Sequence, residues 1–581
     1  MRRRLALCVP EMHWRRNIQS QDEWFAELRC LRSIVWLLAT LFFCVFTCRS
    51  AEGARGSTLI SPVGVNAKPV SIQSPPMGWS SWNSFSNTVN STIVVEQANA
   101  MVSSGLKAHG YEYVNIDEGW WLGNRDPSGN IVVDPKQWPA LGPEDKPGDM
   151  SNITRYLHGL GLKAGIYTDV GKGGCSTWWP DLGPRIPNTG SEGHYDQDFL
   201  QFAKWGFDFV KVDWCGGYQE KLDPKTQYAQ IALSIQRAEK ATGHHLLYSI
   251  CDWNNDESWT WAPGIGGVRA ALWRTSGDIV LPVVANSPNS RRTAEFSKVI
   301  ANFDKAIHPE AEHTGYINDP DMLVVGMPGM SRLQDQVEMS LWSISGAPLL
   351  IGADIKRLTP DTLSMLMNPE VLAIDQDSLG LQGVKIPQAS PALEVIAKRL
   401  AGDGRRAVVL FNNSASPAMM SVGWTELGLD SSLPAKAKDV WSHEELGTYR
   451  SSFAATVPAG AVVMIDLSGT EAMSSRYKST SQANSSSNEF AFSGVRSAGG
   501  STAIQITYTN RTVETHVIEL AVNGCFETRI AFPPTGNGKK EGLITIEAPL
   551  NRSTNGNRLQ FTDSGRRPLT VRAITVFAGQ L

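Results

Sequence analysis

The sequence of 581 residues has little excess charge of either sign and few long apolar stretches. Its 53 lysines and arginines nearly balance 57 aspartates and glutamates, and the net charge of −4 excludes a strongly basic nucleic-acid-binding protein. Charged residues make up only 19% of the chain and hydrophobic residues 42%, so a disordered chain is excluded and a large core can form. A chain of this length predicts about two to four domains.

Cysteine is scarce outside the first 50 residues. Four of the eight cysteines precede residue 50, and the other four are Cys175, Cys215, Cys251 and Cys525. Four cysteines are too few for a disulfide-dense scaffold, so the fold must rest on its core. The sequence contains no CxxC or HExxH zinc pattern, and we expect neither a metal ion nor a cofactor.

The one long apolar run covers residues 33–48 and follows Arg29 and Arg32. It is shorter than the roughly 20 residues that a membrane-spanning helix needs, so residues 1–51 are expected to be a signal peptide. An uncleaved signal anchor is the alternative. We therefore expect a secreted protein of the apoplast or cell wall, with no membrane contact once the leader is cleaved. A vacuolar or Golgi membrane-anchored protein is the alternative.

Asn-x-Ser/Thr sequons are numerous after this leader. They begin at Asn90, Asn152, Asn412, Asn484, Asn510 and Asn551. A single sequon arises easily by chance, but six after a signal-like segment predict a glycoprotein of the secretory pathway.

Strand-like and helical stretches alternate from residue 74 to about residue 387. The strand-like runs are 77–82, 111–121, 162–170, 207–215, 246–253, 270–279, 315–323 and 347–352. Stretches with helical periodicity lie between them, for example 92–104, 196–205 and 226–241. Eight strand–helix units predict an α/β fold, a (β/α)8 TIM barrel over residues 74–387.

Acidic residues stand toward the carboxyl ends of these runs. They are Asp117, Glu118, Asp169, Asp213, Asp252, Asp278 and Asp321. A barrel interior favours Val, Ile and Leu, whereas active sites lie at the carboxyl rim of the strands. The pattern therefore predicts a cluster of carboxylates in an active site. The 19 tryptophans fit either an enzyme that stacks on sugar rings or ordinary core packing.

Beyond residue 387 the pattern changes to short strands without intervening helices. Alternating runs at 393–400, 406–413, 452–459 and 460–467 predict an antiparallel β-sandwich domain over residues 388–470. Residues 471–488 are rich in serine and are expected to be a linker. Residues 489–581 predict a further C-terminal β domain, either a carbohydrate-binding module or a packing domain. It shows no aromatic cluster that would favour sugar binding.

Carboxylates in an aromatic-rich pocket, without a metal motif or a phosphate loop, point to glycoside hydrolysis, which needs two carboxylates on opposite faces of an anomeric carbon. Six segments add to this signal: PPMGWSSWNSF, YVNIDEGWW, GIYTDVG, FVKVDWC, WRTSGDI and NDPDML. In this order and spacing they resemble the α-galactosidase (melibiase) family, glycoside hydrolase family 27. The resemblance covers about residues 74–470.

The resemblance implies a retaining mechanism, with Asp213 as the nucleophile and Asp278 as the general acid/base. The two carboxyl groups of a retaining pair lie about 5–5.5 Å apart. Lys211, two residues before the nucleophile, would keep it ionised. The resemblance also implies a disulfide between Cys175 and Cys215 beside the nucleophile.

Further residues would surround the sugar if the resemblance holds. The implied contacts are Trp79, Asp117, Glu118, Tyr167, Lys211, Cys251, Asp252, Trp253, Arg274 and Asp321. Trp79 would stack under the apolar face of the ring, and Lys211 would bond hydroxyls 3 and 4. Ordinary packing at the rim is the alternative for Trp79, Tyr167 and Trp253.

One departure from the family bears on specificity. Most members carry Asp-Asp where this sequence has Asp117–Glu118. The extra methylene would carry the carboxylate about 1.5 Å further into the pocket, toward the C5 hydroxymethyl group of galactose. L-Arabinopyranose has the same ring stereochemistry without that group. We therefore expect a preference for β-L-arabinopyranosides of about 10–200-fold, with lesser α-galactosidase activity. The substitution also resembles the plant β-L-arabinopyranosidase branch.

A second departure is Asp252–Trp253, where plant members usually carry Glu-Trp. The shorter Asp252 puts a bond to hydroxyl 2 in doubt, and the bulk of Trp253 argues against 2-acetamido sugars.

The expected partner is a carbohydrate, a cell-wall arabinogalactan-type glycan, and not a nucleic acid. An ordinary α-galactosidase acting on oligosaccharides, galactolipids or galactomannans is the alternative. A lectin-like protein is a third possibility, and the oligomeric state stays open.

Overall fold

The computed structural model describes residues 74–179, 186–254, 256–263, 270–280, 292–312, 315–472, 474–483, 488–497, 499–512, 516–532, 535, 541–552, 555–563 and 569–577. The expected leader, residues 1–51, lies outside these ranges. Within them, every helix is too short or too polar to cross a membrane.

Eight parallel strands form the sheet of the first domain. They are β1 (Met77–Ser80), β2 (Tyr113–Ile116), β5 (Lys163–Asp169), β6 (Phe209–Asp213), β7 (Leu247–Cys251), β8 (Leu272–Arg274), β9 (Ile317–Asp319) and β10 (Leu349–Ile351). Their order in the sheet is β10-β1-β2-β5-β6-β7-β8-β9, and a parallel bridge between Leu323 and Ile351 closes the ring. Each strand lies inside a run that the sequence predicted, and the (β/α)8 barrel is confirmed.

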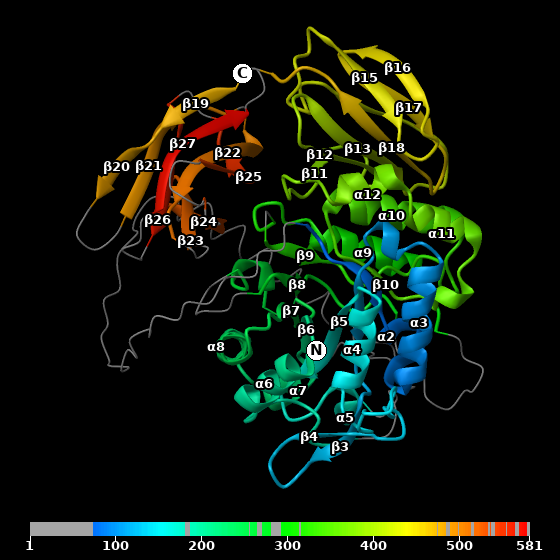
Figure 1. The fold of residues 1–581 in the computed structure, drawn as a ribbon. Coiled ribbons are helices and arrows are strands. Elements are labelled where there is room, and N and C mark those ends of the chain that lie inside the picture. Colours follow the sequence, from blue (N-terminus) through cyan, green and yellow to red (C-terminus); the bar gives the residue numbers. More distant parts are fainter. Residues whose placement is uncertain are drawn as a thin grey trace, which may run out of the picture. The chain divides into compact units, whose positions relative to one another are not determined.

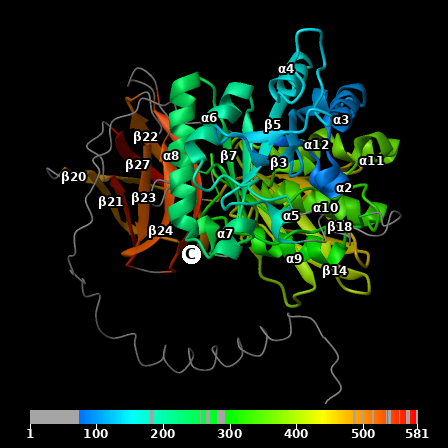
Figure 2. The same cartoon turned by 90° about the horizontal axis from the view of Figure 1, so that it is seen from below.

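Helices surround this ring of strands (Figures 1 and 2). They are α2 (Trp82–Phe85), α3 (Ser91–Ser103), α4 (Ser151–Gly159), α5 (Cys175–Trp178), α6 (Tyr195–Trp205), α7 (Cys215–Glu220), α8 (Pro224–Thr242), α9 (Phe296–Ala306), α10 (Arg332–Ser345), α11 (Pro360–Leu366) and α12 (Pro369–Asp375). Single turns of 3-10 helix are η1 (Ser86–Thr88), η2 (Lys107–His109), η4 (Ser258–Thr260) and η6 (Ile355–Arg357).

The ends of the long helices carry the expected local signals. Helix α8 begins after Asp223, whose side chain accepts a hydrogen bond from the N–H of Thr226. Helix α10 begins with a capping box between Ser331 and Gln334, and ends at Gly346 in the left-handed conformation that glycine adopts without strain. These caps fix where each helix leaves the barrel wall.

A two-stranded hairpin extends the rim after β2. It consists of β3 (Trp121–Arg125) and β4 (Ile131–Val133), which pair antiparallel. The strand-like run predicted over 111–121 ends where this hairpin begins, and the sequence pattern did not indicate the hairpin. Trp121 is buried and packs edge to face on Trp120, so the hairpin is anchored to the barrel.

The second domain is an antiparallel sandwich, drawn mainly in yellow in Figure 1. Its strands are β11 (Val384–Ile386), β12 (Leu393–Arg399), β13 (Arg405–Asn412), β14 (Ala418–Gly423), β15 (Pro434–Asp439), β16 (Glu445–Arg450), β17 (Ser452–Val457) and β18 (Val462–Ser468). One sheet has the order β11-β12-β13-β18-β15-β16, and β14 pairs with β17. Helix α10 contacts β12, β13 and β18, and Trp441 donates a hydrogen bond to Ser340 Oγ of that helix. The barrel and the sandwich thus share a core.

The third unit is also all-β. Its strands are β19 (Ser475–Lys478), β20 (Thr480–Ala483), β21 (Asn488–Val495), β22 (Gly500–Asn510), β23 (His516–Val522), β24 (Cys525–Phe532), β25 (Gly542–Leu550), β26 (Asn557–Asp563) and β27 (Leu569–Phe577). They form two sheets, β19-β27-β22-β25 and β20-β21-β26-β23-β24.

The linker predicted over residues 471–488 needs correction. Strands β19 and β20 lie inside it and pair with β27 and β21. Both are edge strands of their sheets. An edge strand is held by backbone hydrogen bonds to one neighbour and can be polar, which is why serine and threonine there gave no strand signal.

Candidate active site

The carboxyl ends of the barrel strands bring together many of the polar residues that the sequence singled out. Asp169, Asp213 and Cys251 end β5, β6 and β7 and are register partners across adjacent strands. Arg274 and Asp319 end β8 and β9 and are also partners. Because all strands of the barrel end at one rim, these side chains form a continuous polar wall.

Asp213 is buried at the end of β6, with 4% of its surface exposed. Its Oδ1 accepts a hydrogen bond of 2.9 Å from the backbone N–H of Trp214. Burial raises the pKa of the Asp213 carboxyl to about 6, an effect that Lys211 opposes and the charge of Asp278 reinforces. Lys211 therefore acts in the expected direction, but burial outweighs it. The Asp278 carboxylate thus lies near enough to raise the pKa of Asp213.

Lys211 lies on β6, two residues before the nucleophile candidate, and links this strand to Asp117, which follows β2. Its Nζ donates to Asp117 Oδ2 at 2.9 Å and lies 5.4 Å from the centre of the Tyr167 ring. Burial by itself would lower the pKa of the Lys211 ammonium, but Asp117 and the other acidic groups raise it well above its usual value. Lys211 is thus charged and has N–H groups left for a sugar hydroxyl.

Cys175 and Cys215 form a disulfide, with their Cα atoms 5.0 Å apart. They begin α5 and α7, so the bond ties together the segments that follow β5 and β6. The Cys175 sulfur lies 3.6 Å from Asp213 Oδ2. Among the described side chains, these two cysteines and Asp213 are the one group close enough to hold a metal ion. Their sulfurs are joined to each other, which removes the thiolates that a metal would need.

Glu118 is fully buried and faces the start of α5. Its Oε1 accepts hydrogen bonds from the hydroxyl of Ser176 at 2.6 Å and from the backbone N–H of Ser176 at 3.0 Å. Its Oε2 has no partner among the described residues. Burial raises the pKa of the Glu118 carboxyl to about 8, and the charges of Asp117 and Asp213 add to the rise. The sequence predicted a carboxylate that reaches further into the pocket, and in the structure its Oε1 is bound to Ser176 at the start of α5.

Asp278 lies at the mouth of the site, with 34% of its side chain exposed. Arg274 Nη2 lies 3.2 Å from Asp278 Oδ1, and Arg274 Nη1 lies 3.1 Å from Asp321 Oδ1. The other carboxylate oxygen of Asp321 accepts a hydrogen bond of 2.8 Å from the backbone N–H of Ile279. Arg274 and Asp321 therefore hold the segment that carries Asp278 from both sides.

The residues after β7 contact their own turn. Asp252 is buried, and its Oδ1 accepts hydrogen bonds from Ser258 Oγ at 2.6 Å and from the backbone N–H of Asn254 at 3.1 Å. Burial raises the pKa of Asp252 to about 6. Trp253 packs edge to face on Trp179, with ring centres 6.0 Å apart. Asp252 thus shapes the loop from within, while Trp253 belongs to the aromatic rim.

Trp79 and Tyr167 are packed in the wall of the site. Trp79 is fully buried, donates a hydrogen bond of 3.0 Å to the carbonyl of Ala353, and packs edge to face on Phe85. The Tyr167 hydroxyl lies 3.5 Å from the Cys175 sulfur. Both rings are buried in this structure, and their contact with a sugar stays a prediction.

A cavity opens among the polar side chains of the rim. Its polar lining includes Asp117, Lys211, Cys251, Arg274, Asp319 and Asp321. Asp319 was not singled out from the sequence, although it belongs to the NDPDML motif. Its Oδ1 accepts a hydrogen bond of 2.9 Å from the backbone N–H of Asp321, so it supports that residue.

Two more residues near the site were given no role from the sequence. Asp169 was noted only as a strand-end acid; its Oδ1 accepts hydrogen bonds from the N–H groups of Gly171 at 2.7 Å and Gly216 at 2.9 Å. It thus braces the loops beside the nucleophile candidate.

Arg292 lies between β8 and α9 and interacts electrostatically with Asp278 and Asp117. No motif marks it, and only the structure brings it to the rim.

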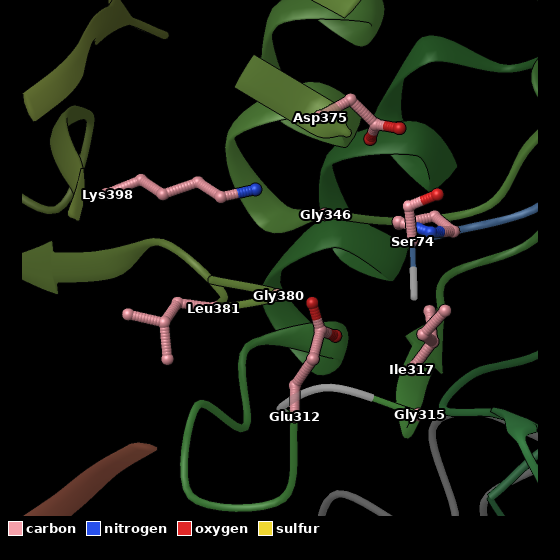
Figure 3. A pocket seen from close by; sticks show the side chains of 10 residues that line it. Ser74, Glu312, Gly315, Ile317, Gly346, Asp375, Gly380, Leu381 and Lys398 are labelled. Carbon is pink, nitrogen blue, oxygen red and sulfur yellow. The ribbon is translucent and has the colours of Figure 1, made fainter. Parts of the chain in front are cut away.

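A separate pocket lies near the amino-terminal ends of β1 and β9, and Figure 3 shows it from close by. Glu312, Asp375 and Lys398 line it together with Ile317, which begins β9. Burial raises the pKa of Glu312 well above its usual value and that of Asp375 to about 8, and it lowers the pKa of Lys398. Lys398 comes from β12 of the sandwich. The pocket therefore belongs to the joint between the two domains and not to the rim that carries the carboxylate pair.

Comparison with known families adds to this geometry. The family described as "Alpha galactosidase A" matches residues 74–377, and its "C-terminal beta sandwich domain" matches residues 390–467. A third family, "Alpha-galactosidase, CBM13 domain", matches residues 489–576. The chain belongs to glycoside hydrolase family 27. Asp213 is buried at the end of β6, and Asp278 lies after β8 at the mouth of the site. In a family 27 barrel this rim is therefore the candidate active site of a glycoside hydrolase.

Individual relatives agree with this assignment. A probable α-galactosidase of Dictyostelium discoideum is 34% identical over 398 residues, which cover 68% of this chain and 93% of the relative. An α-galactosidase of Coffea arabica is 36% identical over 385 residues, 66% of this chain and 91% of the relative. The crystal structure of α-galactosidase I from Mortierella vinacea has a TM-score of 0.58 at 28% identity and covers 69% of this chain and 98% of that one.

One solved structure with another stated activity has the same fold. A family 27 β-L-arabinopyranosidase from Geobacillus stearothermophilus has a TM-score of 0.57 at 23% identity, over 68% of this chain and 96% of that one. At this level of identity the likeness concerns the fold alone.

Proposed function

We propose that the protein is a retaining exo-glycosidase in which Asp213 is the nucleophile and Asp278 the general acid/base. Asp213 attacks the anomeric carbon while Asp278 gives its proton to the departing glycosidic oxygen, which leaves the sugar bound to Asp213. Asp278 then takes a proton from water, and the hydroxide releases the sugar with its original configuration. The observation that carries the proposal is the contrast between a buried Asp213 beside Lys211 and a mouth-facing Asp278 held by Arg274.

We further propose that β-L-arabinopyranosides are the preferred substrates and α-D-galactosides lesser ones. The support comes from Glu118, whose Oε1 is held by two hydrogen bonds to Ser176. Because the side chain is fully buried and its Oε1 is held by Ser176, it cannot swing aside to admit a C5 hydroxymethyl group. An aspartate would end one methylene short of Ser176 and leave that space open.

The test compares kcat/KM for 4-nitrophenyl β-L-arabinopyranoside and 4-nitrophenyl α-D-galactopyranoside. The wild type should favour the arabinoside. Glu118→Asp should move the ratio toward the galactoside by about 10-fold, the scale of one methylene of fit. Ser176→Ala removes the hydroxyl bond to Glu118 Oε1, keeps the backbone bond and leaves the side chain at full length, so it should move the ratio the same way by less. An unchanged ratio with both rates reduced would show that Glu118 makes no choice between the sugars.

An ordinary α-galactosidase is the second candidate. The observation in its favour is that the relatives with 34–36% identity are named α-galactosidases. This candidate predicts that the wild type already prefers the galactoside in the same assay. The two candidates thus differ in one ratio measured on one purified protein.

We also propose that residues 1–51 direct the chain into the secretory pathway and that it acts on cell-wall arabinogalactan-type glycans. The support is the apolar run at 33–48 and the sequons that follow it. Expression of the full chain in a eukaryotic host tests this, with N-terminal sequencing of the protein in the medium. A new N-terminus near residue 51 is the expected result, and retention of the intact leader in membranes would favour the anchored form.

A further inference from the structure

Arg292 is fixed at the rim by three contacts with the segment that follows β1. Its Nη1 donates a hydrogen bond of 2.6 Å to the carbonyl of Trp82, and its Nη2 donates one of 2.9 Å to Ser86 Oγ. The guanidinium carbon lies 4.9 Å from the centre of the Trp82 ring, a cation–π distance. The position and plane of the guanidinium are therefore set in advance of any ligand.

Arg292 differs from the other cations of the site in its partners. Lys211 is paired with Asp117, and Arg274 with Asp278 and Asp321. In the part of the chain that the structure describes, Arg292 has no carboxylate within ion-pair distance, and both of its acceptors are neutral oxygens. Each terminal nitrogen carries two hydrogens, so one N–H on each is left for a further acceptor. The side chain is thus a half-buried cation with no counter-ion among the described residues.

The exposure of the carboxylates shows which part of a substrate would meet this cation. Asp278 is 34% exposed and Asp117 only 3%, so Asp278 lies nearer the mouth. In an exo-glycosidase the terminal sugar fills the closed end and the leaving group starts at the oxygen that the general acid protonates. Arg292 interacts more with the charge of Asp278 than with that of Asp117, and it stands beside Trp82 in the segment that follows β1. It therefore borders the path of the leaving group.

We propose that Arg292 forms an anion subsite that binds a carboxylate on the leaving group, as in a glycan whose terminal sugar is attached to a uronic acid. A guanidinium matches a carboxylate in charge and in the spacing of two N–H donors. This inference rests on the proposed function, because it places the leaving group by the role of Asp278. It adds a substrate class, acidic glycans, that the terminal sugar does not reveal.

Charge balance is the competing role for Arg292. The positive charge could serve only to offset Asp278 and Asp117, with no contact to substrate. In that case its removal would lower the hydrolysis of acidic and neutral substrates equally. An anion subsite predicts instead a loss that depends on the charge of the leaving group, and the two roles can be separated by a matched pair of substrates.

The experiment uses two disaccharides with a terminal β-L-arabinopyranosyl residue in the same linkage, one to glucuronic acid and one to glucose. The kcat/KM ratio of the acidic to the neutral disaccharide is measured for the full-length wild type, Arg292→Gln, Arg292→Lys and Arg332→Gln. Arg332 is a matched control, since it lies on α10 with 74% of its side chain exposed. The ratio is measured at low salt and at about 0.3 M NaCl, where exposed charges are screened.

The wild type should prefer the acidic disaccharide by about 10-fold, the scale of one charge-assisted hydrogen-bonded pair. Arg292→Gln should abolish that preference, Arg292→Lys should keep part of it, and Arg332→Gln should leave it intact. Added salt should weaken it. Equal kcat/KM values in the wild type, or a preference that survives in Arg292→Gln, would overturn the subsite. If the nitrophenyl glycosides are not hydrolysed either, the proposed function itself fails.

Discussion

Asp321 and Arg274 form a buried ion pair that positions the general acid/base candidate. Asp321 Oδ1 lies 3.1 Å from Arg274 Nη1, and its other oxygen accepts a hydrogen bond from the N–H of Ile279, next to Asp278. The backbone of Asp321 has φ of +120°, a conformation that residues with a side chain rarely adopt, and Asp319 fixes its N–H. A strained backbone conformation of this kind persists only where several surrounding contacts hold it, which is common at functional sites. Asp321 is therefore a positioning residue.

Replacement of Asp321 by asparagine should disturb the placement of Asp278. The amide can still accept from Ile279, but it leaves Arg274 without one of its two carboxylates. We expect a loss of up to about 3–5 kcal/mol in the free energy of unfolding, measured in urea. Activity should fall more for disaccharides than for nitrophenyl glycosides, because an activated leaving group needs little protonation. Asp278→Ala should lower the activity on disaccharides, relative to nitrophenyl glycosides, still more than the Asp321 variant does. Equal losses on both substrate types would argue against positioning.

The ionisation of Asp213 should set the acid limb of the pH profile. With its pKa raised to about 6, kcat/KM should rise with pH through about 6 as the nucleophile becomes ionised. Lys211 lowers the pKa of Asp213, so Lys211→Met should move this limb to higher pH, by about one unit. Lys356→Met is the control, since that lysine pairs with Glu96 away from the site. A limb that stays in place in Lys211→Met would show that another group controls it.

The sequence predicted the eight barrel strands because apolar runs of strand length alternate with helical periodicity. It also placed Asp213 and Asp278 through motifs whose residues are adjacent in the chain. Contacts between distant segments left no such signal. Glu118 and Ser176 are 58 residues apart, and Arg292 reaches Trp82 across 210 residues. Which way a side chain turns at the end of a strand depends on these distant partners, so the sequence alone could not show it.

The buried cluster between the barrel and the sandwich should make stability depend on pH. Asp375 has a pKa of about 8 in the folded chain and about 4 when unfolded. Between these values the folded state keeps a proton that the unfolded state releases, so stability falls as pH rises from about 4 to 8. One such group contributes at most about 1.4 kcal/mol per pH unit.

Asp375→Asn removes this titration and should flatten the fall in melting temperature between pH 5 and 7.5. Asp361→Asn is the control, since that carboxylate is 77% exposed. A slope that is the same in Asp375→Asn and the wild type would mean that Asp375 is ionised in the folded state.

Burial divides the sequons into two groups. Asn152, Asn412 and Asn510 are buried, and the amide nitrogen of each donates a hydrogen bond of 2.8 Å to a backbone carbonyl. A glycan is attached at that nitrogen, so these three sites are incompatible with the fold when glycosylated. We therefore expect no glycan at these three sequons, and the prediction of a glycoprotein depends on the others.

Asn551 is exposed and Asn90 is half-buried, while Asn484 lies outside the described residues. Peptide mass mapping of protein secreted from a eukaryotic host should find a glycan at Asn551 and none at the three buried sites. Asn551→Gln should remove that glycan with little change in stability. A glycan on Asn412 in folded, active protein would contradict this arrangement of the sandwich.

The central claim is that Asp213 attacks the anomeric carbon, and the product formed by Asp213→Gly in the presence of azide tests it most directly. Azide can take the place of the missing carboxylate and displace nitrophenolate from 4-nitrophenyl β-L-arabinopyranoside with inversion. The variant should be nearly inactive alone, and azide should restore turnover and yield α-L-arabinopyranosyl azide, identified by NMR. Near-wild-type hydrolysis without azide, or an azide product of unchanged β configuration, would contradict the assignment of Asp213 as the nucleophile.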